Sequence, residues 1–139
     1  MATRSEAWAR SRFVAASVAR LATVSAAGEP HLVPVVFAVV GSTIVTGVDH
    51  KPKSTTRLKR LRNISETGRV ALLVDEYAED WSQLWWARAD GAARVVDGGR
   101  AGAEEVVALT ARYPQYADRP PTGPFILVDV HHWSGWSAS

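Results

Sequence analysis

The chain has 139 residues, of which 47% are hydrophobic and 22% charged, and its formal net charge is only +2. This composition is typical of one globular domain and excludes a generally basic protein, so we expect a single domain over residues 1–139. The chain has no cysteine, which excludes disulfides, a thiolate nucleophile and cysteine metal sites. It also has no run of about 18 apolar residues that could span a membrane and no apolar signal-peptide core, so we expect a cytoplasmic protein.

The first half of the chain predicts one helix and three antiparallel strands. The pattern Thr3-Arg4-Ser5-Glu6 matches a capping box and predicts a helix that ends near Ser17. Alternating apolar residues and turn signals predict strands at residues 20–25, 31–40 and 43–48. Pro34 lies inside the second strand, where it cannot donate a ladder hydrogen bond, and therefore predicts an edge position or a bulge.

The second half predicts two further helices and three further strands. A basic helix follows Ser54, and a second helix is expected at residues 101–113. The strands are expected at residues 69–74, 82–96 and 125–131, with a bulge or bend at Gly91. Six strands with flanking helices predict a mainly β fold, a small antiparallel barrel of six strands.

The strongest functional signal is a basic segment at residues 51–63, which contains six Lys or Arg residues and no acid. Ser54 or Thr55 can cap the helix that starts there, and Leu58, Leu61 and Ile64 give this helix one apolar edge. A helix start with free N–H groups, hydroxyls and flanking lysines suits an anion such as a phosphate.

The basic segment has two other interpretations. A solvated basic helix without a ligand has a similar composition. Nucleic-acid binding also uses clustered cations, but the chain has no zinc-binding cysteines, no RNA-binding aromatic signature and no long basic tail. A small cofactor that carries phosphate is the interpretation we favour.

Read in order, the residues resemble the split β-barrel flavin and deazaflavin oxidoreductases, the superfamily that includes pyridoxamine phosphate oxidase. The segments that carry this resemblance are residues 21–24 (LATV), 28–31 (GEPH), 34–37 (PVVF), Asp49, 51–54 (KPKS) and 57–64 (RLKRLRNI). The segments that resemble a subgroup described as deazaflavin-dependent are residues 80–82 (DWS), 84–86 (LWW), Arg88, 112–116 (RYPQY) and 123–124 (GP). The similarity extends from about Val18 to Trp136.

The resemblance implies a homodimeric split barrel with two cofactor sites in the grooves between the subunits. It places Val35, Val36, Phe37 and Ala38 along the flat cofactor ring, and Thr46, Gly47 and Val48 beside the ribityl chain. It places Lys51, Lys53, Ser54 and Arg57 at the phosphate, and Arg60 at the same anion or at an extended tail. Gly47, which lacks a Cβ, would let a ligand approach the backbone closely.

The cofactor implied is coenzyme F420, with FMN as the alternative, because the long cationic run suits the more anionic F420 tail. The expected activity is hydride transfer from reduced deazaflavin to an unsaturated organic acceptor. An FMN-dependent oxidase or reductase of the pyridoxamine phosphate oxidase type is one alternative. A non-catalytic binder of deazaflavin, flavin or a tetrapyrrole is another.

No catalytic residue and no metal site can be assigned from the sequence. His31 and His50 lie near the proposed site, where a neutral, hydrogen-bonded histidine and a general acid are both open. The acids at residues 75–80 are interpreted as a solvated turn. Trp85 and Trp86 alternate on one strand, so one is expected to face the barrel core and the other the dimer groove or the substrate. Arg88 is expected to pair with the cofactor tail or with an acid across the interface. Trp133 and Trp136 either cover the partner's site or fill the end of the barrel.

Overall fold

The computed structural model describes residues 2–48, 55–97 and 102–139. The strands among these residues are β1 (Ala2–Arg4), β2 (Ala19–Val24), β3 (Pro30–Val35), β4 (Ala38–Val40), β5 (Thr43–Gly47), β6 (Arg69–Glu76), β7 (Trp85–Val96) and β8 (Phe125–Ser137). The helices are α1 (Glu6–Ala15), α2 (Thr55–Thr67), the 3₁₀ helix η1 (Trp81–Gln83), α3 (Ala103–Arg112) and α4 (Gln115–Asp118).

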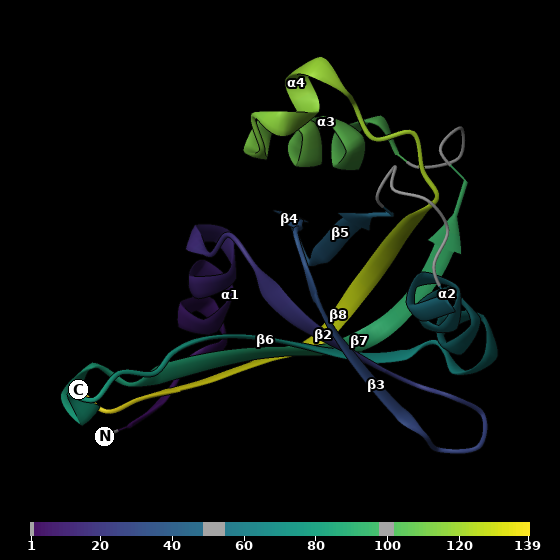
Figure 1. Ribbon diagram of the computed structural model, residues 1–139. Helices are drawn as coiled ribbons and strands as arrows, with labels where there is room; N and C mark the ends of the chain where they lie inside the picture. The colour runs from purple at the N-terminus through teal and green to yellow at the C-terminus, as the bar shows by residue number, and fades with distance from the viewer. Residues whose placement is uncertain (1, 49–54, 98–101) are drawn as a thin grey trace.

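The strands form one antiparallel sheet in the order β3-β2-β6-β7-β8-β5-β4, with β1 paired to the C-terminal half of β8 (Figure 1). The expected mainly β fold with flanking helices is therefore confirmed. The prediction of six strands is wrong, because eight strands occur among the described residues and the sheet is not closed. Strands β3 and β4 form its two ends, and Pro34 on β3 has the edge position that its missing N–H requires.

The two additional strands occur where the chain changes its strand partner, and the local sequence does not indicate such a change. The apolar run at residues 31–40 breaks into β3 and β4 because the chain crosses from one end of the sheet to the other at residues 36–37. The short strand β1 lies where a helix start was expected. The N-cap of α1 is Ser5 instead of Thr3, and its side chain accepts a hydrogen bond from the Trp8 N–H at 3.1 Å.

The pairing of the long strands β7 and β8 contains a bulge, and the sequence predicted a bulge or bend at Gly91. The pairing register shifts between Asp90 and Gly91, as expected for a glycine within a strand. A Cβ at position 91 would lie 2.2 Å from the backbone oxygen of Asp129, so any other residue there would force the backbone to shift. Beyond this bulge β8 continues to Ser137, six residues past its predicted end.

The main hydrophobic core lies between the inner face of the sheet and α1. Phe13 of α1 is fully buried and contacts the rings of Phe37 and Trp133 edge to face, at centroid distances of 5.9 Å and 5.4 Å. A second, smaller core forms where α3 covers the other face of β4 and β5, around Leu109 and Phe125. No helix among residues 2–48, 55–97 and 102–139 is both long and apolar enough to cross a membrane.

The outer face of β6, β7 and β8 carries two indoles side by side. Trp86 and Trp136 are directly opposed partners, and both are half-buried. Leu32 of β3 lies on the same outer side and is 66% exposed. The strand alternation therefore places Trp85 toward α1 and the core, and Trp86 on the outside.

Candidate functional site

The structure brings together part of the two strand segments to which the resemblance assigned the cofactor ring and its ribityl chain; residues 35–38 and 46–48 are together called the candidate strip. Ala38 of β4 is the direct partner of Val45 of β5, the residue before Thr46, whereas Val35 pairs with Ala19 of β2 at the other end of the sheet. Val36 and Gly47 are half-buried, while Val35, Phe37, Ala38, Thr46 and Val48 are buried. Only part of this strip therefore offers surface to a ligand.

Phe37 takes part in this strip differently from the expectation. Its ring fills the main core with no exposed surface. Its backbone N–H donates to Tyr113 Oη, and its carbonyl oxygen lies at hydrogen-bond distance from the same hydroxyl, each at 2.8 Å. The polar groups of Phe37 thus already have partners within the chain, and its half-buried neighbour Val36 offers more surface for ligand contact than the buried Ala38.

The role that the sequence suggested for Gly47 is not supported on its Cβ side. A Cβ at this position would lie 3.4 Å from Leu109, 3.5 Å from Pro121 and 3.6 Å from Phe125. These are ordinary contact distances to protein side chains, so the Cβ side of Gly47 faces α3 and the loop before β8 and is not open space.

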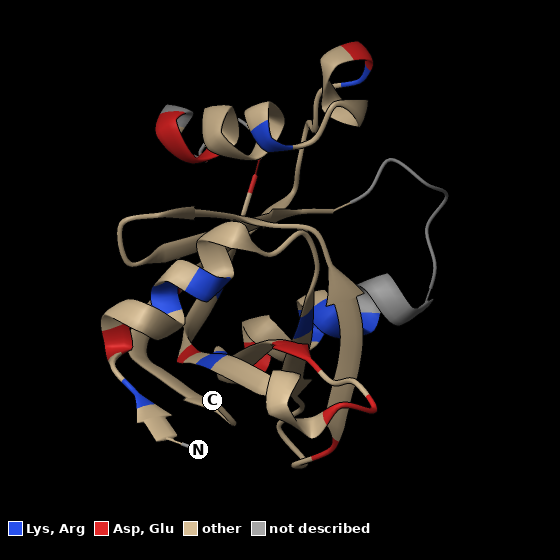
Figure 2. Ribbon diagram, turned by 90° about the vertical axis from the view of Figure 1, so that its left-hand side faces the viewer, with Lys and Arg blue, Asp and Glu red and all other residues tan. Residues whose placement is uncertain are grey.

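The basic segment is described only in its second half. Lys51, Lys53 and Ser54 lie outside the described residues, and so does the side chain of Arg57. Within the described part of α2, Lys59 and Arg62 are exposed and Arg60 is half-buried. Figure 2 shows the positions of Lys and Arg along the described ribbon in blue. A surface pocket of about 510 Å³ lies beside them, between α2 and the β2–β3 turn, and is also lined by Glu29 and Glu66.

A buried hydrogen bond anchors α2 to the sheet at this point. The Asn63 side chain donates from Nδ2 to Oγ1 of Thr23 at 3.1 Å, and both residues are at most 3% exposed. Glu66 accepts a further hydrogen bond from the N–H of Ala26 in the β2–β3 turn. The helix that carries the cations is therefore held at a defined position on β2.

The charges on α2 affect the pKa of His31 on β3. It is the direct partner of Thr23, so its side chain lies on the same face of the sheet as the Asn63–Thr23 bond. Desolvation lowers the pKa of His31, and the charges of Lys59 and Arg60 lower this pKa further. Its Nδ1 atom is buried and has no hydrogen-bond partner among the described residues. The histidine is thus neutral at pH 7, and the field around it is positive.

The other residues singled out in the sequence have structural partners. Asp80 caps η1 by accepting hydrogen bonds from the N–H and hydroxyl of Ser82, which lower its pKa. The described residues contain no group of three or more potential metal ligands. Trp133 is buried in the main core, where its ring contacts that of Phe13.

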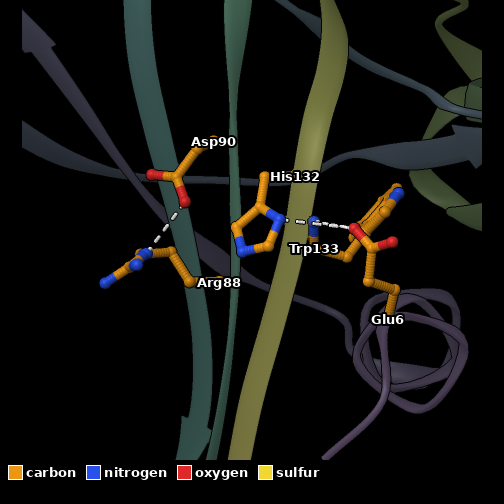
Figure 3. Close-up of polar contacts among 5 residues, drawn as sticks. All are labelled: Glu6, Arg88, Asp90, His132 and Trp133. Atoms are coloured by element: carbon orange, nitrogen blue, oxygen red, sulfur yellow. Dashed lines mark hydrogen bonds and ion pairs between the residues drawn. The ribbon is translucent and has the colours of Figure 1, made fainter.

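Arg88 and His132 also find partners within the chain (Figure 3). Arg88 pairs with Asp90 at 3.0 Å, and His132 Nδ1 lies 3.4 Å from Oε1 of Glu6 on α1. The side chains of both pairs are at least 40% exposed, so each pair contributes at most about 1 kcal/mol. The expectation that Arg88 pairs with a cofactor tail or with an acid across the interface stays a prediction.

Sequence reasoning missed two residues that shape this region. Asn63 was expected only as part of a basic run, although a polar residue on the apolar edge of a helix is a signal for a buried hydrogen bond. Tyr113 was noted only as part of a motif, because its partner Phe37 lies 76 positions away in the sequence.

Comparisons with known proteins agree with this fold. The sequence profile of the family described as pyridoxamine 5'-phosphate oxidase matches residues 7–137. A 5a,11a-dehydrotetracycline/5a,11a-dehydrooxytetracycline reductase from Streptomyces rimosus subsp. rimosus is 43% identical over 60 residues, which are 41% of this chain and 39% of the reductase. The chain thus matches well under half the length of that curated relative.

Two solved structures illustrate the shared architecture. A FAD-binding protein from Mesorhizobium loti superimposes with a TM-score of 0.71 at 20% identity and covers 99% of this chain and 98% of its own. The heme storage protein HutZ from Vibrio cholerae has a TM-score of 0.67 at 17% identity, over 94% of this chain and 93% of its own. At these identities the likeness shows the fold alone.

Proposed function

The chain belongs to the pyridoxamine 5'-phosphate oxidase family, and from this premise we propose that it is an oxidoreductase that binds coenzyme F420. The reaction proposed is transfer of a hydride from the reduced cofactor to an unsaturated organic acceptor. The observation that carries the proposal is the surface pocket beside α2, which is lined by the cations Lys59 and Arg62. The pKa of His31 agrees with a positive field there, because burial lowers it first and the charges of Lys59 and Arg60 lower it further.

That field suits the anionic part of such a cofactor. A phosphate beside Lys59 and Arg60 would gain charge-assisted hydrogen bonds, which are about twice as strong as neutral ones. His31 Nδ1 is buried and has no hydrogen-bond partner among the described residues, so it can accept or donate one bond toward a ligand. By resemblance, Lys51, Lys53, Ser54 and Arg57 would complete the phosphate site, with Arg60 toward the same anion or the tail.

The described strip at residues 35–38 and 46–48 would hold the flat part of the cofactor. The backbone and side chains of Val36 and Ala38 offer apolar contact next to the core, which keeps water from that side of a ring. By resemblance, Thr46, Gly47 and Val48 would border the ribityl chain. When bound, reduced F420 supplies a hydride, so the protein has to orient the ring and the acceptor.

His31 is not proposed as the proton donor. Its lowered pKa keeps it neutral at pH 7, and its position among cations opposes protonation further. We propose instead that it is a neutral hydrogen-bonding partner of the anion.

The class of acceptor is supported by the curated relative. The name of the Streptomyces reductase describes reduction of dehydrotetracyclines, which are unsaturated compounds. The match covers 60 residues of that protein, and we carry over only the chemical class, a conjugated and unsaturated organic molecule.

A homodimer is part of the proposal. The outer face of the sheet carries the Trp86–Trp136 pair and the exposed Leu32, and indoles are enriched at subunit interfaces. Light scattering on the purified chain should give twice the chain mass, and Trp86→Glu, which places a charge in that face, should shift it toward a monomer.

The experiment that tests the cofactor is a pair of titrations on one protein sample. We expect a colourless preparation that binds F420, seen by quenching of tryptophan fluorescence, more tightly than FMN, and that oxidises reduced F420 when a conjugated enone is added. A yellow preparation with a flavin spectrum would favour an FMN enzyme. Binding without turnover of any quinone, enone or bilin would favour a non-catalytic carrier.

A further inference from the structure

The crossing between β3 and β4 lacks the hydrogen bonds that hold the rest of the sheet. Strand β3 pairs with β2 up to Val35, and β4 pairs with β5 from Ala38, so Val36 and Phe37 take no part in either ladder. A buried backbone group without a partner costs free energy comparable to a lost hydrogen bond. The chain must therefore satisfy the peptide groups at this crossing from somewhere else.

Tyr113, at the C-terminal end of α3, supplies the replacement. Its hydroxyl accepts from the N–H of Phe37 at 2.8 Å. Its single proton can be donated to the carbonyl of Phe37 at 2.8 Å or to that of Ser17 at 3.0 Å. One side chain thus contacts both backbone polar groups of Phe37, which lie in the two consecutive peptide units of the crossing.

The neighbouring Arg112 ties the same crossing to α1. Its Nη1 donates to the carbonyl of Val14 at 2.8 Å, and Nη2 donates to the carbonyl of Ala16, at the C-terminal end of α1. Its guanidinium also lies over the rings of Phe37 and Tyr113, each 5.8 Å from the ring centroid. Two adjacent residues therefore join α1, α3 and the crossing.

We infer that Tyr113 is a positioning residue for the cofactor, because its hydroxyl holds the backbone of residues 36–38 in the conformation that the ring requires. This inference rests on the proposed function, which places that segment along the ring. If the backbone of residues 36–38 shifts by a fraction of an ångström, every contact along a rigid flat ligand changes. On this inference Tyr113 acts on the cofactor through the backbone of Phe37, whose N–H and carbonyl its hydroxyl contacts.

The variant Tyr113→Phe tests the inference, since it removes only the hydroxyl and leaves the ring and its contact with Tyr116. The matched control is Tyr77→Phe, which removes the hydroxyl of a tyrosine that is 64% exposed. Three quantities are measured for wild type and both variants: the dissociation constant for F420, the melting temperature and amide hydrogen exchange at Phe37. Hydrogen exchange is measured without cofactor, so it reports how well the backbone of the crossing is held independently of cofactor binding.

We expect the amide hydrogen of Phe37 to exchange about tenfold faster in Tyr113→Phe than in wild type, while the exchange rates of the core strands stay unchanged. We also expect roughly fivefold weaker F420 binding, as for the loss of one hydrogen bond, while Tyr77→Phe matches wild type in both. Unchanged exchange at Phe37, or unchanged affinity despite faster exchange, would overturn the inference.

A different result would show that the proposed function itself is wrong. In that case wild type binds neither F420 nor FMN, whatever the variants do. The cofactor role of Tyr113 then falls with it, and the exchange data alone decide whether Tyr113 holds the crossing.

Discussion

The Nδ2 of Asn63 donates a hydrogen bond to Oγ1 of Thr23 across 3.1 Å in the interior of the protein. This bond joins the basic helix α2 to β2 at the residue that pairs with His31. It therefore sets how close Lys59 and Arg60 come to the imidazole, and links the packing of α2 to the charge of the proposed anion site.

Replacing Asn63 with Ala should destabilise the protein by about 2 kcal/mol, because it leaves a buried hydroxyl without its donor and opens a small cavity. Chemical denaturation followed by tryptophan fluorescence measures this change. The control Ser65→Ala alters an exposed residue of the same helix and should stay within about 0.5 kcal/mol of wild type. Equal stability of the two variants would show that the bond does not anchor α2.

The double variant Lys53→Ala/Arg57→Ala should weaken F420 binding about tenfold or more, equivalent to ~1.4 kcal/mol. Both residues belong to the cationic segment that the resemblance assigns to the phosphate. Fluorescence titration at low and high salt measures the effect, and the wild-type affinity should fall more steeply with salt than that of the variant.

A control with the same loss of charge is Arg69→Ala/Arg119→Ala, at two exposed arginines outside the segment. It should bind F420 as wild type does. If both double variants lose affinity equally, net charge alone explains the binding and the phosphate assignment is wrong.

His31 should make stability depend on pH below neutrality. Its pKa in the folded state is lowered from the ordinary value of 6.5, so in the window below 6.5 the unfolded chain binds a proton that the folded chain does not. The free energy of unfolding therefore falls as pH drops through 6.5, until the folded-state pKa is reached. Denaturation curves between pH 5 and about pH 8 measure this slope.

The variant His31→Gln should lose that part of the slope, whereas His131→Gln, at an exposed position on β8, should keep it. A bound phosphate-bearing ligand should raise the pKa of His31, because a nearby anion favours the charged imidazole. Proton NMR of the imidazole follows this change directly, and a pKa unmoved by saturating F420 would place the anion elsewhere.

Gly91 and Gly47 provide a matched pair of glycines within the sheet. Gly91→Ala should destabilise the protein by about 2–3 kcal/mol, because the new Cβ meets the backbone oxygen of Asp129 at 2.2 Å. Gly47→Ala places its Cβ at ordinary contact distances of 3.4–3.6 Å, so it should cost less than about 1 kcal/mol and leave F420 affinity unchanged. A large loss of F420 affinity in Gly47→Ala would restore the close ligand approach expected from the sequence.

Much of the secondary structure could be predicted because its signals are local. The strands around β2, β5 and β6 follow from apolar alternation, the edge position of β3 follows from Pro34, and the bulge follows from Gly91. The basic segment was equally visible, since charge and spacing are properties of the sequence itself.

Tertiary structure alone decided the strand partners, the division of residues 31–40 into β3 and β4, and the extension of β8 to Ser137. It also decided that Trp85 faces inward and Trp86 outward, and that Tyr113 holds Phe37. The physical reason is that these features depend on contacts between residues far apart in the chain. Periodicity shows which residues share a face, but long-range packing determines what that face meets.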